Sequence, residues 1–303
     1  MMKRLLLHIG YPKAGSTTLQ NGPFLRLHKE KSINFLARAW ESDFYGNREN
    51  HALYKAWFYD VVDNHSHDAV KPIGVMSDDL PNLLSEGLFI MNELRNETIQ
   101  GPQALFEYFS RQADKLDVLI VIRNQPDLIQ SYYIQGYRRF EQKLFTDFLA
   151  QHMKSDWKGE GKIFNFHDVA SAYSAVFGKD NIHIILFEDF VRRKELFSNQ
   201  LAKALGIDPA VIKRLVGEDH LNKTPKEPGI LVVRRHYAKT LRGQAIRTLE
   251  KFAPRLADSL RIRVPVATEA ERNAIVESFR VSNLRLADEF SLDKQAMREY
   301  GYF

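Results

Sequence analysis

The stretch from residue 10 to residue 19 contains the residue types that bind phosphate groups. Gly10 and Gly15 are separated by four residues, a lysine lies between them, and hydroxyl residues follow the second glycine. A glycine loop between a strand and a helix presents backbone N–H groups to a ligand, and the helix dipole adds partial positive charge. The stretch therefore favours an anion. The residues expected to line it are Lys13, Ala14, Gly15, Ser16, Thr17 and Thr18.

This stretch differs from a nucleotide-binding P-loop at one position. A P-loop has its lysine directly after the second glycine. Here Ser16 stands in that place, and the lysine lies inside the loop as Lys13. The sequence predicts an altered P-loop built around a different leaving group. The alternative is a plain strand–turn–helix connection with a chance lysine.

A second candidate anion site follows the apolar run 118–122. The run ends in Arg123, Pro126 can open a helix at its first position, and Ser131 then falls in the second turn. An arginine at the carboxyl end of a buried strand can hold a phosphate with two parallel hydrogen bonds. Alternatively, Arg123 forms a salt bridge to a helix.

The two stretches together resemble the sulfotransferase family. Residues 12–20 are similar to that family's 5′-phosphosulfate loop, and Arg123, Pro126 and Ser131 are similar to its 3′-phosphate motif. The resemblance implies 3′-phosphoadenosine 5′-phosphosulfate (PAPS) as sulfuryl donor, a hydroxyl or amine acceptor, and no metal. It implies that Lys13 binds the 5′-phosphosulfate and the bridging oxygen. Arg123 and Ser131 would hold the 3′-phosphate.

An acceptor hydroxyl needs a base, and two neighbouring carboxylates are candidates. Ser77, Asp78 and Asp79 resemble the Ser-Glu strand end of bacterial sulfotransferases, with aspartate in place of glutamate. Two carboxylates beside an anionic donor favour proton binding. Asp79 could instead cap the following helix, and His8 is the next candidate base, although a histidine within a buried strand is usually a core residue.

The segment 221–225 resembles the Asn-x-Ser stretch that follows the core in bacterial sulfotransferases. Asn222 and Lys223 could close over the bound nucleotide, and a plain polar loop is the equal alternative.

These residues require strands that end at one edge of a sheet. Continuous apolar runs predict strands buried on both faces at 4–9, 33–36, 72–76, 118–122 and 182–187. Helical patterns between them cover 16–29, 52–64, 103–115, 126–140 and 166–177. The alternation predicts an α/β fold with a P-loop-NTPase-like parallel sheet, flanked by helices on both faces. Ligands of such sheets bind at the carboxyl edge.

The pattern after residue 187 is mainly helical. Helices are predicted over 195–205, 209–216, 230–252 and 269–290. We expect one domain over residues 1–303, in which 1–190 form the α/β nucleotide-binding core and 191–303 a helical extension.

Composition excludes several classes of protein. Of the 303 residues, 44% are hydrophobic and 27% are charged, which excludes a disordered chain. There is no apolar run long enough for a transmembrane helix. The apolar run 5–7 is too short for an export signal. The absence of cysteine excludes disulfides and thiol nucleophiles. We expect a cytoplasmic protein.

The basic segment 234–263 contains nine Lys and Arg residues against two acidic ones, in a chain of net charge +5. It indicates either a solvated helix face or an anionic partner, which could be a nucleotide, an acidic glycan or a membrane surface at the inner face of the membrane. The resemblance to bacterial carbohydrate-type sulfotransferases implies a carbohydrate or glycolipid acceptor, and the basic segment favours one that is anionic or membrane-associated. Tyr132, Tyr133 and Tyr137 could stack on its sugar rings or belong to the core.

Two other functions compete with sulfotransfer. A P-loop small-molecule kinase using Mg-ATP would explain the glycine spacing, and Glu188 and Asp189 would imitate its magnesium-binding carboxylates. A non-catalytic module could bind a polyanion through the basic segment. No nucleic-acid motif accompanies that segment, so nucleic acid is not expected as a partner.

Overall fold

The computed structural model describes residues 4–11, 14–24, 26–27, 30, 32–36, 88–93, 102–111, 113–136, 144–217, 230–233, 262–265 and 267–303. The predicted strand 72–76 and the predicted helix 52–64 lie outside these ranges. Within them, no helix is both long and apolar enough to cross a membrane.

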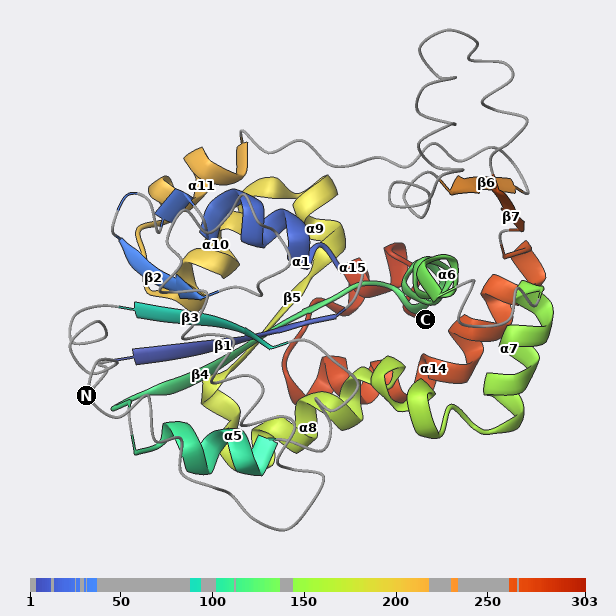
Figure 1. The fold of residues 1–303 in the computed structure, drawn as a ribbon, viewed down its shortest axis with the longest axis horizontal. Coiled ribbons are helices and arrows are strands. Elements are labelled where there is room, and N and C mark those ends of the chain that lie inside the picture. The colour runs from blue at the N-terminus through green and yellow to red at the C-terminus, as the bar shows by residue number, and fades with distance from the viewer. Residues whose placement is uncertain are drawn as a thin grey trace, which may run out of the picture.

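A parallel sheet forms the centre of the described fold (Figure 1). Its strands run in the order β2-β3-β1-β4-β5, and all pairs are parallel. In chain order they are β1 (Arg4–Gly10), β2 (Ile33–Leu36), β3 (Leu88–Glu93), β4 (Leu116–Ile122) and β5 (Ile182–Leu186). Since the strands are parallel, the ends of β1, β4 and β5 meet at one edge, as predicted.

Strand β3 was not predicted. Its apolar run, Leu88 to Met91, is four residues long and leads into Asn92 and Glu93. A run of this length fits a strand or a buried helix equally. Pairing with β1 on one side and β2 on the other makes it a strand.

Helices cover both faces of the sheet, as predicted (Figure 1). Alternate residues of β1 pack on opposite faces of the sheet. Leu5 and Leu7 belong to a core cluster that includes residues of α8 (Phe166–Phe177), and Leu6 belongs to a second cluster that includes residues of α10 (Lys194–Leu205). The elements of this part are α1 (Ser16–Leu19), η1 (Gln20–Phe24), α5 (Pro102–Phe109), α6 (Gln125–Gly136), α7 (Phe145–Lys154), η4 (Gly159–Phe164), α8 (Phe166–Phe177), η5 (Lys179–Asn181), α9 (Phe187–Arg192), α10 (Lys194–Leu205) and α11 (Pro209–Gly217).

Two predicted helices are shorter than expected. In the segment predicted as a helix over 16–29, the regular α-helix ends at Leu19. Gly22 has non-helical backbone angles (φ −98°, ψ −108°), and Pro23 follows it. The helix predicted over 103–115 ends at Phe109. The Lys115 carbonyl accepts a hydrogen bond from the Leu5 amide at 2.9 Å, so the chain is already in the sheet there.

The C-terminal residues form α14 (Glu269–Glu289) and α15 (Lys294–Glu299). Thr268 and Glu271 form a capping box that fixes the start of α14. Ile275, Phe279 and Leu286 of this helix belong to the same core cluster as α8, so the C-terminal helices pack directly on the α/β core.

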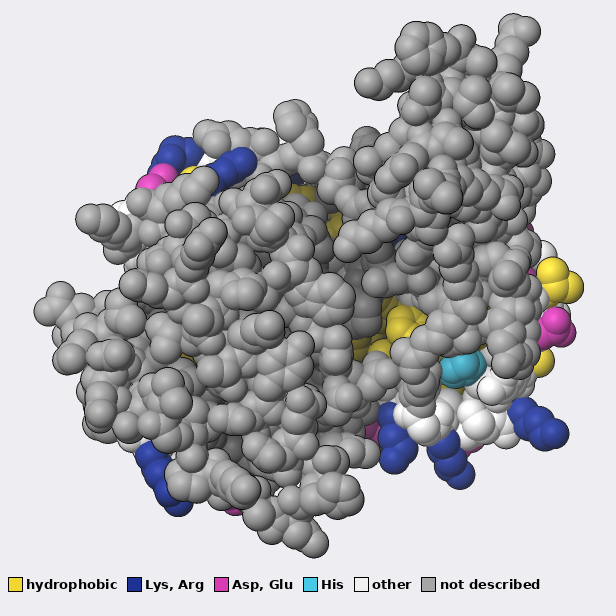
Figure 2. Space-filling model, in the orientation of Figure 1, with side chains coloured by type: hydrophobic (Ala, Val, Ile, Leu, Met, Phe, Trp, Pro, Cys, Tyr) yellow, Lys and Arg dark blue, Asp and Glu magenta, His cyan; other side chains and the backbone are white. Residues whose placement is uncertain are grey.

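The prediction of a helix over 230–252 is wrong for residues 230–233. Ile230–Val233 form strand β6, which pairs antiparallel with β7 (Ile262–Pro265). The residues Ile-Leu-Val-Val are β-branched or apolar, and pairing decides their conformation. Residues 234–252 lie outside the described part. On the face drawn in Figure 2, the described Lys and Arg side chains lie at several separate places along the edge.

Candidate functional site

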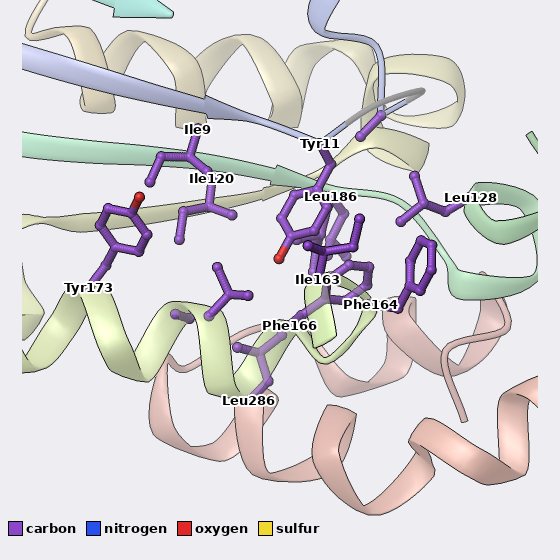
Figure 3. Close-up of a cluster of buried hydrophobic side chains, with 14 of the residues drawn as sticks. Ile9, Tyr11, Ile120, Leu128, Ile163, Phe164, Phe166, Tyr173, Leu186 and Leu286 are labelled. Carbon is purple, nitrogen blue, oxygen red and sulfur yellow. The ribbon is translucent and has the colours of Figure 1, made fainter. Parts of the chain in front are cut away.

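The loop after β1 is anchored at both ends. The Ala14 amide donates to the Tyr11 carbonyl at 3.2 Å, which closes a four-residue turn. Tyr11 and Ala14 are both buried. The ring of Tyr11 points from the end of β1 towards α8 (Figure 3) and contacts Phe166 edge-on, with ring centroids 5.1 Å apart. Burial raises the pKa of Tyr11 above its ordinary value. The loop therefore starts from a fixed point.

Gly15 is required where the loop enters α1. Its φ is +79°, a conformation that favours glycine. A β-carbon at this position would lie 2.3 Å from Cε2 of Phe187, the first residue of α9. Helix α1 starts directly afterwards at Ser16 and includes Thr17 and the half-buried Thr18, as the phosphate-loop prediction requires.

We expect Gly15→Ala to weaken both the fold and the binding of an anion at this loop. The positive φ alone costs about 1–2 kcal/mol for a residue with a β-carbon, and the methyl group forces Phe187 to move. Urea unfolding gives the first effect, and calorimetry with a nucleotide gives the second. Gly159→Ala is the matched control, because Gly159 has a φ of +65° and nothing within 4 Å of an added β-carbon. Equal nucleotide binding by the two variants would show that the contact with Phe187 does not matter.

Arg123 lies at the end of β4 and faces the same aromatic ring. Its Cζ atom is 5.4 Å from the centroid of Phe187. Phe187 thus lies against both the Gly15 turn and the Arg123 side chain, and it joins the two predicted anion sites. This ring was not predicted to have a role, because nothing in its local sequence indicates the contact.

The surroundings of Arg123 include a second arginine. Nη2 of Arg123 is 3.2 Å from one oxygen of Asp127, and Nη2 of Arg272 on α14 is 2.8 Å from the other. The alternative of a salt bridge to a helix is therefore also realised. A fifth of the Arg123 side chain remains accessible. The two guanidinium groups exceed the charge of the Asp127 carboxylate that they share.

Helix α6 begins one residue earlier than predicted. Asn124 precedes it, and its Oδ1 accepts from the Asp127 amide at 3.0 Å. Pro126 is consequently the second helical residue, which is tolerated because the first four amides of a helix lack partners within the helix. Ser131 lies in the second turn, as predicted, and is half-buried.

Three other candidate residues lie in the hydrophobic core or pack against it. His8 is fully buried in β1 and contacts Phe24 edge-on at 5.5 Å, which favours the core interpretation. Tyr133 is fully buried against Phe145, and Tyr132 packs on Phe164, so both contribute to the core.

Glu188 and Asp189, the carboxylates that would imitate a kinase, are buried in the first turn of α9. Glu188 accepts from Asn124 and Tyr302, and Asp189 accepts from Tyr300 and Arg193. Both carboxylates therefore serve internal hydrogen bonds.

The remaining predictions fall outside the described residues. They are Lys13, Asp78, Asp79, Tyr137, Asn222, Lys223 and the part of the basic segment from 234 to 261.

Comparisons with known proteins concern both the sequence and the fold. Residues 3–227 match the family model described as "Sulfotransferase domain". The chain is similar to the crystal structure of a sulfotransferase from Alicyclobacillus acidocaldarius, with 14% identity, a TM-score of 0.55, and coverage of 98% of this chain and 100% of that one. It is also similar to the sulfotransferase domain from the curacin biosynthetic pathway, with 12% identity, a TM-score of 0.38, and coverage of 75% and 81%. No curated protein matches the chain.

The likeness to the Alicyclobacillus protein confirms the predicted P-loop-like α/β fold. The matched range 3–227 includes all five strands of the central sheet and both predicted anion sites. It ends before β6, α14 and α15.

Proposed function

Because the chain belongs to the sulfotransferase family, and is therefore a sulfotransferase enzyme, we propose that PAPS is its donor and that the acceptor is a hydroxyl group of a carbohydrate or glycolipid. In this reaction the bond between sulfur and the bridging oxygen of the 5′-phosphosulfate breaks. A bond between sulfur and the acceptor oxygen forms, the acceptor proton passes to a base, and 3′-phosphoadenosine 5′-phosphate (PAP) is released.

One observation carries the proposal: Phe187 lies against both Gly15 and Arg123. Gly15 and Arg123 belong to the two stretches that resemble the family's phosphate motifs, and they are 108 residues apart in the sequence. A single ring brings them into one neighbourhood at the carboxyl edge of the sheet. A donor with anionic groups at its 5′ and 3′ positions needs such a pair of sites.

The proposed roles follow from the charge on the donor. Lys13 neutralises charge that develops on the leaving oxygen, with help from the backbone amides of residues 14–18. Arg123 and Ser131 hold the 3′-phosphate, and Asn222 and Lys223 close over the nucleotide. No metal ion is required, because lysine and N–H groups supply the positive charge that magnesium supplies in kinases.

A thermal shift experiment tests the donor. A ligand at about 100 times its dissociation constant stabilises a fold by about 2.7 kcal/mol, which shifts the melting temperature by several degrees. We expect PAP to give this shift in EDTA. A kinase would instead be stabilised by ATP only with magnesium, and a polyanion-binding module would respond to heparin-like polymers at low salt. A shift with magnesium-ATP and none with PAP would contradict the proposal.

We expect Arg123→Ala to reduce donor affinity more than turnover. The loss of a charge-assisted hydrogen bond costs about 1.5–3 kcal/mol, which corresponds to an increase of about 10–150-fold in the Kd of PAP. The variant should also lose the preference for PAP over adenosine 5′-phosphate (AMP), which lacks the 3′-phosphate. Calorimetry with the two nucleotides measures both effects.

Arg280→Ala is the control for this prediction. Arg280 is exposed on α14 and pairs with Glu277 at 3.2 Å, so its loss should leave both nucleotides unaffected. If Arg123→Ala still discriminated between PAP and AMP as the unmodified enzyme does, Arg123 would not hold the 3′-phosphate.

The acceptor proposal has support from the sequence. Nine basic residues between 234 and 263 would favour an anionic or membrane-associated glycan. Binding of such an acceptor would bring the enzyme to the inner face of the membrane.

A further inference from the structure

The turn directly after Arg123 is fixed by a carboxylate from the first turn of α9, the helix that follows strand β5. The backbone N–H of Asn124 donates to Oε1 of Glu188 at 2.9 Å, and Nδ2 of Asn124 donates to the same oxygen at 2.8 Å. Because Asn124 also caps α6 through its Oδ1, one residue connects the end of β4 with the starts of α6 and α9. The direction in which the chain leaves Arg123 therefore depends on Glu188.

The other oxygen of Glu188 is held by the C-terminal segment. The hydroxyl of Tyr302 donates to Oε2 at 2.9 Å. Glu188 is buried and Tyr302 is fully buried. Burial raises the pKa of Glu188 above its ordinary value, and the hydrogen bonds from Asn124 and Tyr302 oppose that shift. A buried carboxylate that loses a donor is left with an uncompensated desolvation cost, so loss of the hydroxyl would disturb the turn that Glu188 holds.

The main chain of Tyr302 is tied to the same turn by a second route. Nδ2 of Asn283, on α14, donates to the Tyr302 carbonyl at 2.8 Å and to Oε1 of Gln125 at 3.0 Å. Nε2 of Gln125 donates back to Oδ1 of Asn283 at 2.9 Å. Gln125 and Asn283 are both buried. The backbone of Tyr302 is thus held in place independently of its hydroxyl group.

These contacts come from a part of the chain that the family model does not cover. Tyr302 and Asn283 lie beyond the matched range 3–227, as does Arg272, which pairs with Asp127 in the first turn of α6. The structure assigns Tyr302 as a positioning residue for the donor's 3′-phosphate, because its hydroxyl holds Glu188 and Glu188 holds the turn that directs Arg123. This assignment rests on the proposed function of Arg123.

The chain offers a matched control for the loss of this hydroxyl. Two residues earlier, the hydroxyl of Tyr300 donates to Oδ1 of Asp189 at 2.8 Å. Each tyrosine thus donates to one of two adjacent buried carboxylates at the start of α9. Asp189 also accepts from Arg193, which directly follows α9, whereas Glu188 accepts from Asn124. Phenylalanine at either position removes one hydroxyl group. Of the two hydroxyls, that of Tyr302 is connected through Glu188 to the turn after Arg123.

The experiment compares Tyr302→Phe with Tyr300→Phe. For each variant, calorimetry gives the ratio of the Kd of AMP to that of PAP, and circular dichroism gives the melting temperature. A displacement of about 1 Å at a binding group can cost about 10²-fold, and one lost hydrogen bond loosens the turn without removing it. We therefore expect Tyr302→Phe to lower the ratio about tenfold and to raise the KM for PAPS with little change in kcat. Both variants should melt at lower temperature, and Tyr300→Phe should keep the ratio.

An unchanged ratio in folded Tyr302→Phe would overturn the assignment, and so would an equal fall in both variants. Arg123→Ala separates this failure from failure of the proposed function. If Arg123→Ala keeps the ratio, Arg123 does not hold the 3′-phosphate. If Arg123→Ala loses it and Tyr302→Phe does not, only the role of Tyr302 is wrong.

A measurement on the unmodified enzyme covers the case in which Tyr302→Phe does not fold. Coupling between two sites is reciprocal, so binding of a 3′-phosphate must strengthen the contact of Tyr302. In hydrogen exchange, we expect PAP to slow exchange in peptides from residues 294–303 more than AMP does at equal saturation. Equal protection by the two nucleotides would overturn the assignment.

Discussion

Replacing Lys13 with alanine is expected to lower turnover by about 10²–10³-fold, which is the effect of losing one preorganised group that stabilises transition-state charge, about 2.7–4 kcal/mol. Lys13 lies in sequence between Tyr11 and Ala14, whose backbone hydrogen bond closes the loop. Tyr11 and Ala14 are both buried, so these two positions are fixed before the donor arrives. The lysine contact is strongest when the leaving oxygen gains charge, so kcat should fall more than PAP affinity.

The control for this substitution is a lysine at the opposite edge of the sheet. Lys115 directly precedes β4, is exposed, and lies 3.6 Å from Asp117. Lys115→Ala should leave kcat unchanged. A folded Lys13→Ala enzyme with full turnover would eliminate the proposed mechanism.

We expect Asp78→Asn to slow the chemical step by about 10²-fold, the lower end of the range for general base catalysis. Sulfuryl transfer, like phosphoryl transfer, is expected to have a loose transition state, in which removal of the acceptor proton contributes modestly. A base acts when it is deprotonated, so kcat of the unmodified enzyme should fall as pH drops through the pKa of this group. The variant should lose that acidic limb and bind PAP normally.

Asp79→Asn is the neighbouring control and should slow the reaction less. If neither substitution slows turnover more than a few-fold, another group is the base. His8 would then be tested next, although its burial in β1 makes it a core residue.

The sequence predicts the architecture well where the local signal is strong. Strand β4 contains the continuous apolar run 118–122, every residue of β4 is buried, and β1 contains the apolar run 5–7. Such runs specify a strand covered on both faces. The signal fails for β3 and for Ile230–Val233, since pairing with another strand determines both conformations. The other four strands of the central sheet, by contrast, need little more than their apolar runs to be predicted.

Some residues of the candidate site can likewise be predicted from the local sequence, and others cannot. Gly15, Arg123 and Ser131 belong to short motifs, so their positions can be predicted from nearby residues. Phe187 acquires its place only when β5 pairs with β4, which pairs with β1 on its other side. Glu188 follows a predicted strand, and its local sequence indicates only a metal ligand of a kinase. Its partner Tyr302 is 114 residues away, and no local pattern can reveal that contact.

The bond between Glu188 and Tyr302 also sets an order of events during synthesis of the protein. The ribosome adds about 5–20 residues per second, so the 114 residues that separate the two take about 6–23 s to make. Throughout that time the nascent chain already contains both phosphate motifs, yet Glu188, which holds the turn after Arg123, lacks the hydrogen bond from Tyr302. On the proposed role of Tyr302, an unfinished chain holds PAPS more weakly than the finished one. Tight donor binding is thus a property of chains whose translation has passed residue 302.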